Sequence, residues 1–169
     1  MTVELKKLSI TDGMDIYNML QEIPEQESGF TNNAYGLSFD EYKQWLIKND
    51  NISKGIDLED WMVPGHTYWL YVDGKPVGIG RLRIHLTEKL QKDGGHCGYA
   101  IAPSYRGFGY GTLLLNLLII EANNLKLDKI LLTIQNDNTV SLKVAANNGG
   151  VVEKVIDDKH YIWIDCFAE

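Results

Sequence analysis

The chain has few of the residues that build cross-linked, secreted or membrane-spanning proteins. It contains two cysteines, Cys97 and Cys166, which lie too far apart in sequence to indicate a disulfide framework or a metal site. Its longest apolar stretch, around residues 113–120, is interrupted by Asn116 and is too short to span a bilayer. Residues 1–7 lack the apolar core of a signal peptide. These absences predict a cytoplasmic protein with no metal and no membrane segment.

Basic residues are also in deficit, because 16 Lys and Arg stand against 23 Asp and Glu, which gives a net charge of −7. A nucleic-acid-binding protein normally has a basic face, so this balance argues against a nucleic-acid partner. It is compatible with a cationic acceptor molecule but does not establish one. The length of 169 residues, with 44% hydrophobic and 23% charged residues, predicts a single globular domain spanning residues 1–169.

Glycine, by contrast, occurs at every second position in residues 106–111, Arg-Gly-Phe-Gly-Tyr-Gly. The segment lies between an apolar run that ends at Pro103 and a leucine-rich stretch with the character of a helix. Alternate glycines let the backbone bend tightly and approach a ligand closely. The helix start adds unpaired N–H groups and the positive end of its dipole. Together these features predict a cradle for phosphate.

Two common phosphate sites fit the segment poorly. A P-loop requires Gly-Lys-Ser/Thr, whereas Gly111 is followed by Thr112 and Leu113. A dinucleotide-binding turn requires G-x-G-x-x-G close to the strand end and an acidic residue after the next strand. Asp137 falls near that place, but the spacing here is G-x-G-x-G and residues 103–106 separate the strand from the glycines. A helix that simply begins after a glycine turn is the remaining alternative.

Hydrophobic periodicity and turn residues predict the order β-α-α-β-β-β-α-β-α-β-β. The expected strands are 3–10, 67–72, 77–84, 95–101, 130–135, 151–156 and 160–165. The expected helices are 13–23, a second one opened by the capping box Ser38–Glu41, 109–125 and 138–147, while 24–37 is expected to be irregular. This order is typical of an α/β fold of the mixed α+β kind, with a mostly antiparallel sheet flanked by helices.

Residues 98–111 resemble the first motif of the GNAT superfamily of acyl-CoA N-acyltransferases, Gln/Arg-x-x-Gly-x-Gly/Ala, which follows a strand and a proline. Residues 136–141, Asn-Asp-Asn-Thr-Val-Ser, are similar to its second motif, Asn-x-x-Ser/Ala. Residues 63–69, 94–96 and 148–150 are similar to a bacterial subgroup of predicted acetyltransferases. The resemblance implies the GNAT fold, acetyl-CoA as acyl donor, and transfer of its acetyl group to an amine of a small molecule or peptide.

The resemblance also implies where acetyl-CoA binds. The glycine turn would hold the pyrophosphate, the strand before it would offer main-chain groups to pantetheine, and the amide of Ile101 would stabilise the oxyanion. Asn138 and Ser141 match positions that contact the pantetheine arm, although helix capping would suit both residue types equally. The expected contacts come from Tyr99, Ala100, Ile101, Ala102, Arg106, Gly107, Phe108, Gly109, Tyr110, Gly111, Asn138 and Ser141.

The groups that move protons are less well determined. In many relatives a tyrosine acts as the general acid at the position where this chain has Ala145. Tyr110, Tyr161 and Cys97 are the candidates that could replace it as proton donor. His96 is the first candidate for the base, because it opens the strand before the turn and a histidine has a pKa near neutral pH. A structural histidine at a strand start is an equal alternative. Glu27 and Glu41 are weaker candidates for the base, and a water chain to a backbone carbonyl would need no dedicated base.

The acceptor is expected to bind on residues before Trp69. Aromatic side chains gather there, and a pocket that combined some of them with Glu25, Glu27 and Glu41 would suit a cationic amine or a peptide N-terminus. Such aromatics also commonly form core. The alternative function is a regulatory module that binds acyl-CoA without catalysis. The absence of the family tyrosine is compatible with this alternative, because a protein that has lost its general acid could still bind the cofactor. The acceptor, the acyl chain and the oligomeric state, including a homodimer, are left undetermined.

Overall fold

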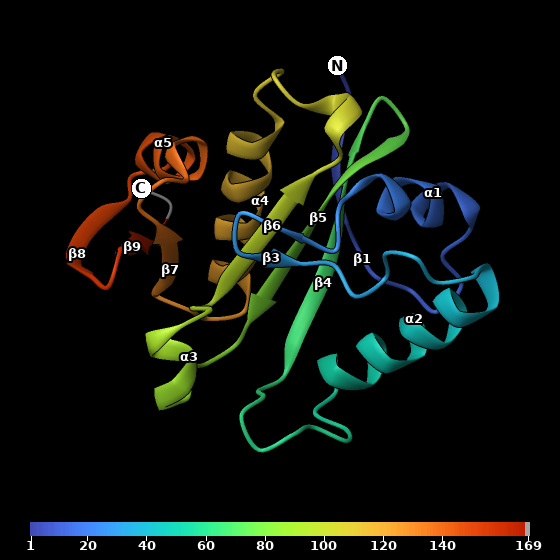
Figure 1. Ribbon diagram of the computed structural model, residues 1–169, viewed down its shortest axis with the longest axis horizontal. Coiled ribbons are helices and arrows are strands. Elements are labelled where there is room, and N and C mark those ends of the chain that lie inside the picture. The colour runs from blue at the N-terminus through green and yellow to red at the C-terminus, as the bar shows by residue number, and fades with distance from the viewer. Residues whose placement is uncertain (168–169) are drawn as a thin grey trace.

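Two antiparallel sheets form the frame of the protein in a computed structural model, which describes residues 1–167 (Figure 1). The first has the strand order β1-β4-β5-β6, with β1 (Val3–Lys7), β4 (Gly65–Val72), β5 (Lys75–Arg83) and β6 (Cys97–Ile101). The second has the order β7-β9-β8, with β7 (Lys129–Gln135), β9 (Lys159–Asp165) and β8 (Val151–Ile156). Every pair of neighbouring strands is antiparallel, so the predicted fold class is confirmed.

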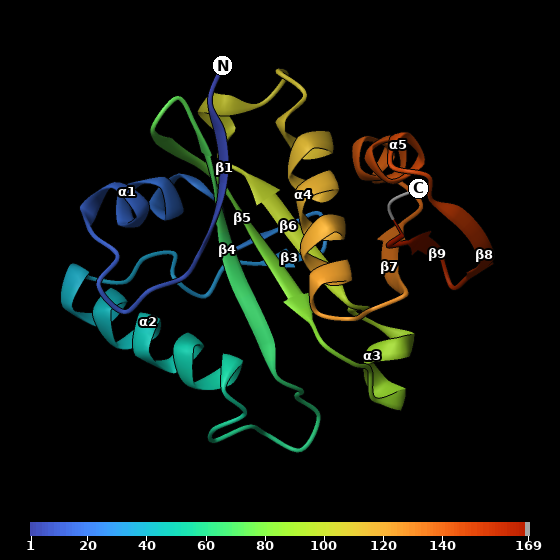
Figure 2. The ribbon, with the colours of Figure 1, turned by 180° about the vertical axis from the view of Figure 1, so that it is seen from behind.

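Helices cover both faces of the first sheet. Helices α1 (Met14–Glu22) and α2 (Phe39–Ser53) lie on one face and α4 (Tyr110–Asn124) lies on the other, while α5 (Thr139–Asn147) packs beside α4 (Figures 1 and 2). Strand β4 is therefore apolar on both sides. Trp69 faces the α1–α2 layer, and Leu70 faces α4.

Local sequence signals account for several of these boundaries. Ser38 accepts a hydrogen bond from the Glu41 N–H, and the Glu41 carboxylate accepts one from the Ser38 N–H, so the predicted capping box begins α2. Strands β4 and β5 are joined at Asp73 and Gly74, whose φ angles are 50° and 78°. Asp-Gly tolerates two positive φ angles better than most pairs, which favours a tight hairpin here.

The expectation that residues 24–37 are irregular is wrong in part. This segment contains a small hairpin of β2 (Gln26–Glu27) and β3 (Phe30–Thr31), which turns at Ser28 and Gly29. Two-residue strands show no periodicity, so the hydrophobic pattern gave no sign of them. The five-residue helix α3 (Glu88–Lys92) and a 3-10 turn at residues 103–105 were missed for the same reason. The hairpin matters most, because it reaches the candidate site.

Strands β6 and β7 lie side by side but separate along their length, and we call the opening between them the fork. At its closed end the His96 N–H donates to the Leu131 carbonyl (2.8 Å), and the Leu131 N–H donates to His96 Nδ1 (2.9 Å). Gly95, with φ of 59°, permits this approach, because a Cβ there would lie 2.3 Å from the Leu131 oxygen. The fork leaves one edge of β6 open.

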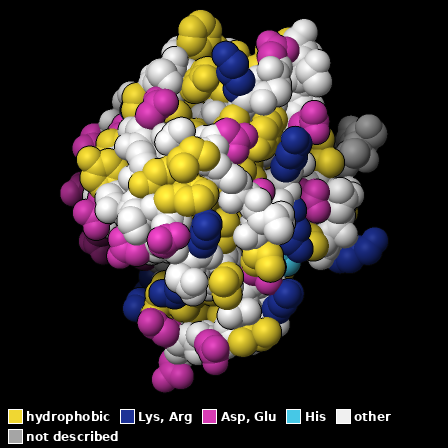
Figure 3. Space-filling view, turned by 90° about the vertical axis from the view of Figure 1, so that its right-hand side faces the viewer, with side chains coloured by type: hydrophobic (Ala, Val, Ile, Leu, Met, Phe, Trp, Pro, Cys, Tyr) yellow, Lys and Arg dark blue, Asp and Glu magenta, His cyan; other side chains and the backbone are white. Residues whose placement is uncertain are grey.

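The face formed by α1 and α2 carries Asp and Glu side chains with some Lys and Arg between them (Figure 3). Among residues 1–167, no helix combines the length and apolarity needed to cross a membrane.

Candidate functional site

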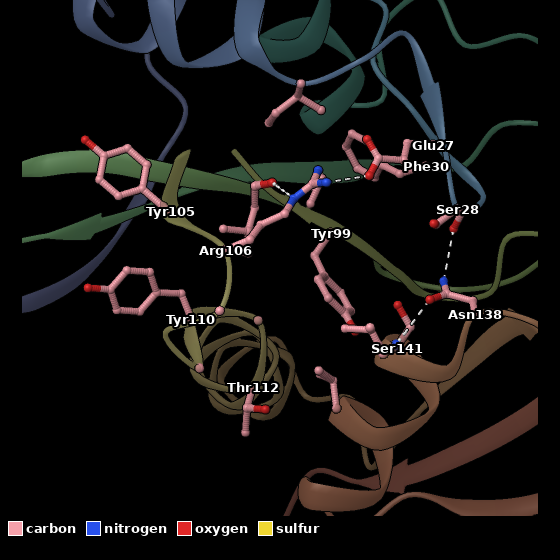
Figure 4. A pocket seen from close by; sticks show the side chains of 18 residues that line it. Glu27, Ser28, Phe30, Tyr99, Tyr105, Arg106, Tyr110, Thr112, Asn138 and Ser141 are labelled. Carbon is pink, nitrogen blue, oxygen red and sulfur yellow. Dashed lines mark hydrogen bonds and ion pairs between the residues drawn. The ribbon is translucent and has the colours of Figure 1, made fainter. Parts of the chain in front are cut away.

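A cavity of about 450 Å³ extends from the glycine turn to the open edge of β6 (Figure 4). Its walls come from the β2–β3 hairpin, from β6, and from the first turns of α4 and α5. The lining consists of Ile23, Glu27, Ser28, Phe30, Tyr99, Ala100, Ile101, Tyr105, Arg106, Gly107, Gly109, Tyr110, Gly111, Thr112, Asn138, Val140, Ser141 and Val144.

The glycine turn forms one end of this cavity. Gly107 and Gly109 have φ angles of 86° and 81°, and a Cβ at either position would meet no atom within 4 Å. The backbone is therefore left-handed and uncovered at both places. Gly109 is the N-cap of α4, and the first intrahelical bond runs from Leu113 N–H to the Gly109 carbonyl. The N–H groups of residues 110–112 precede that bond and have no partner within the helix, so they can donate to an anion.

The open edge of β6 forms the cavity floor. The Ala102 N–H donates to the Val77 carbonyl on β5. Because main-chain groups alternate in direction along an antiparallel strand, the N–H and C=O groups of Tyr99 and Ile101 point away from β5 and toward the fork. This alternation favours the expected oxyanion role of the Ile101 amide. Ala102 does not line the cavity and is fully buried in the core beneath α1 and α2.

Asn138 caps α5 and also reaches across the cavity. Its side-chain oxygen accepts a hydrogen bond from the Ser141 N–H (3.2 Å), as the capping alternative requires. Its Nδ2 donates to the Ser28 carbonyl on the β2–β3 hairpin (3.3 Å). Asn138 therefore holds the hairpin over the fork as well as beginning the helix (Figure 4).

Arg106 lies along the same edge and does not turn its guanidinium toward the glycines. Its Nε donates to the Ile101 carbonyl (2.9 Å), and its Nη1 pairs with the Glu27 carboxylate (2.5 Å). Arg106 and Asn138 thus attach the hairpin at two points (Figure 4). Arg81 on β5 supplies a third point of attachment by donating to the Thr31 carbonyl (2.8 Å).

Sequence reasoning missed Arg81 and the ion pair of Arg106 with Glu27, although an arginine in a largely apolar strand is a usable signal. Glu41, by contrast, is occupied in the cap of α2 and lines neither this cavity nor a second one beyond Tyr99. Glu27 is the acidic candidate that the structure places at the cavity.

His96 lies outside the cavity lining and is buried, with 7% of its surface exposed. Burial and the nearby charges of Arg83 and His85 lower the pKa of His96 to about 4. Its Nδ1 accepts from the Leu131 N–H, so the proton of the neutral ring is on Nε2 and no lone pair is left to deprotonate an amine. These facts favour the structural alternative for His96, which joins β6 to β7 at the closed end of the fork.

The three substitutes for the missing tyrosine occupy different places. The Tyr161 hydroxyl donates to the Lys92 carbonyl (2.8 Å), outside the main cavity. Tyr110 lines the cavity at the glycine-turn end, where its ring lies 5.7 Å from that of Phe108. Cys97 is buried, and burial raises the pKa of its thiol to about 12. Ala145 itself is fully buried.

Ten of the twelve residues expected to contact acetyl-CoA line the cavity, and the two that do not are Ala102 and Phe108. Phe108 is exposed on the outside of the turn. Among residues 1–167, no three His, Cys, Asp or Glu side chains are grouped so that they could hold a metal ion.

Comparison with known proteins places this arrangement in a family. Residues 21–149 match the family described as the acetyltransferase (GNAT) family. No curated protein matches the chain by sequence.

Solved structures share the fold at low sequence identity. The Campylobacter jejuni N-acetyltransferase PseH in complex with acetyl coenzyme A is 15% identical, with a TM-score of 0.64 over 97% of this chain and 99% of that chain. The ribosomal L7/L12 α-N-protein acetyltransferase RimL, in complex with coenzyme A, is 16% identical, with a TM-score of 0.73 over 98% and 96%. A spermidine N-acetyltransferase from Vibrio cholerae, described as dodecameric, is 18% identical, with a TM-score of 0.64 over 97% and 94%.

These likenesses show the fold, and the family match spans well over half of the chain. The protein belongs to the acetyltransferase (GNAT) family.

Proposed function

We propose that this enzyme transfers the acetyl group of acetyl-CoA to a cationic amine that approaches Glu27. The observation that carries the proposal is the single cavity that joins an uncovered glycine turn, the open edge of β6 and the Glu27 carboxylate. The residues present fit acetyl-CoA, since the turn can accept a pyrophosphate and the open edge can pair with an amide-bearing arm.

The charge around the acceptor side supports a cationic substrate. Residues 8–42 contain no Lys or Arg and seven acidic residues. These are Asp12, Asp15, Glu22, Glu25, Glu27, Asp40 and Glu41. A surface of one sign raises the local concentration of ligands of the opposite sign. Glu27 is the member of this set that lines the cavity.

In this proposal each part of the chain has a stated task. The amides of residues 110–112 hold the pyrophosphate, Asn138 holds the pantetheine arm, and the Ile101 N–H polarises the thioester carbonyl. Holding amine and thioester together supplies most of the rate, because an aligned pair reacts without the entropy cost of encounter. One oxyanion donor typically contributes about 100–1,000-fold in rate.

Thiol release from acetyl-CoA, followed with a thiol-reactive dye, tests this function directly. We expect saturable release with at least one member of a panel that contains a polyamine, an amino sugar and a peptide with a free N-terminus. Binding of acetyl-CoA without release on any of these amines would instead support the regulatory module. A homodimer stays a prediction from the sequence.

The Glu27→Gln variant tests the acceptor assignment. Removing the carboxylate charge is expected to raise the KM of a cationic amine about tenfold, which corresponds to roughly 1.4 kcal/mol, and to change kcat less. Glu25→Gln is the matched control, because Glu25 is exposed and does not line the cavity. Equal effects of the two substitutions would mean that net charge, and not contact at Glu27, attracts the amine.

A further inference from the structure

A second cavity of about 110 Å³ lies on the far side of Tyr99 and opens between β6 and β7. Its polar walls include Asp93, Thr133, Gln135 and Lys159. The two cavities have five lining residues in common, which are Ser28, Phe30, Tyr99, Asn138 and Ser141. A donor held by the glycine turn and an amine near Glu27 would both occupy the first cavity, so the thioester and the amine would meet beside these shared residues.

Among the five shared residues, Tyr99 is the one with a phenol hydroxyl that can donate a proton. Its ring extends from β6 toward the first turn of α5, close to Ser141 (Figure 4). Its hydroxyl is buried and makes no hydrogen bond within 3.5 Å among residues 1–167. The Ser141 side chain beside it favours the deprotonated phenol as a donor would, so the phenol proton itself has no acceptor. Buried hydroxyls are normally paired, because an unpaired one costs stability. A phenol proton without an acceptor, at the junction of the two cavities, points to a ligand atom as its partner.

We propose that Tyr99 is the catalytic acid of this enzyme, whose hydroxyl donates to the thioester sulfur and passes its proton to the departing thiolate. The proposal rests on the proposed function. A C–N bond forms between the amine nitrogen and the acyl carbon while the C–S bond breaks, and its electron pair goes to sulfur. The reacting nitrogen first gives up its ammonium proton to water, and it loses a second proton to water after the C–N bond forms. Sulfur receives the Tyr99 proton, and the phenol is then restored by a proton from water.

The other proton donors near the fork are less suitable. The Tyr161 hydroxyl is already bonded to the Lys92 carbonyl, and the Cys97 side chain does not line the donor cavity. Burial raises the pKa of Tyr99 to about 12, and the Ser141 side chain offsets part of that rise. The phenol therefore keeps its proton throughout the neutral range and can donate when charge develops on sulfur.

Tyr99→Phe removes the one oxygen and leaves the ring in place. We expect kcat to fall about 100-fold, with unchanged affinity for acetyl-CoA. The thermal midpoint should stay the same or rise, because the lost hydroxyl had no partner. Tyr161→Phe is the matched control and should keep wild-type kcat. A Tyr99→Phe enzyme with wild-type kcat would overturn the proposal.

A second measurement does not depend on turnover. Titrating the thiol of bound CoA by its thiolate absorbance should give a higher pKa in Tyr99→Phe than in the wild type, because a hydroxyl donor stabilises the thiolate. Equal values would show that Tyr99 does not contact sulfur and would overturn the proposal. If the wild type acetylates no amine, the proposed function fails, while this titration still decides whether Tyr99 contacts the sulfur.

Discussion

Replacement of Gly109 by glutamate is expected to weaken acetyl-CoA binding about 100-fold or more, which corresponds to about 3 kcal/mol. Gly109 has a left-handed φ of 81° and begins α4 at the point where its first N–H groups are exposed. A carboxylate there would occupy the space of the pyrophosphate and repel its charge. Calorimetric titration of both proteins with acetyl-CoA measures the loss.

Gly149→Glu is the matched control for this experiment. Gly149 has a φ of 80° and a Cβ there would also meet no atom within 4 Å, so the backbone strain and the added charge are the same. Gly149 lines neither cavity. We expect the control to bind acetyl-CoA like the wild type. Wild-type affinity in Gly109→Glu would contradict the assignment of the glycine turn to the pyrophosphate.

Acid is expected to destabilise the protein through His96. The pKa of His96 falls from 6.5 to about 4 on folding, so between these values the unfolded chain binds a proton that the folded chain does not. Stability is therefore complete above about pH 6.5 and is lost progressively as the pH falls to about 4, by roughly 3 kcal/mol. Denaturant unfolding at a series of pH values measures this loss.

His96→Asn isolates the contribution of the imidazole, because an asparagine oxygen can accept from the Leu131 N–H but does not titrate. Other groups, including the half-buried His66, titrate in both proteins and cancel in the difference. The difference in unfolding free energy between wild type and variant should therefore shrink between pH 6.5 and 4. A difference that is independent of pH would refute this account.

The glycine turn and the start of α5 could be predicted because their signals are local. Gly107 and Gly109 need positive φ angles, and Asn138 begins a helix, so neighbouring residues define each of these features. The main strands were predictable for a related reason. Strand β4 is apolar on both faces because helices cover both, and β-rich residues fill it throughout.

The acceptor side depends on contacts between distant segments, which periodicity does not report. The Glu27 and Arg106 pair spans 79 residues of sequence, and Asn138 bonds to Ser28 across 110. His96 illustrates the same limit. Its residue type suggested a base, but its partner, the amide of Leu131, lies in another sheet and sets its tautomer, while burial and the charges of Arg83 and His85 lower its pKa.

The two hydrogen bonds between His96 and Leu131 fix one end of β6 relative to β7, so any change in the angle between these strands would occur about this point, which we call the pivot. Strand β6 runs five residues beyond it to Ile101, a lever of about 17 Å. A tilt of about 3° at the pivot would move the far end by about 1 Å, a displacement large enough to change the rate of a reaction that depends on alignment. If the proposed reaction takes place at the fork, the His96–Leu131 bond pair would help the pairing of β6 with β5 to keep the two substrates aligned, although it lies far from the thioester.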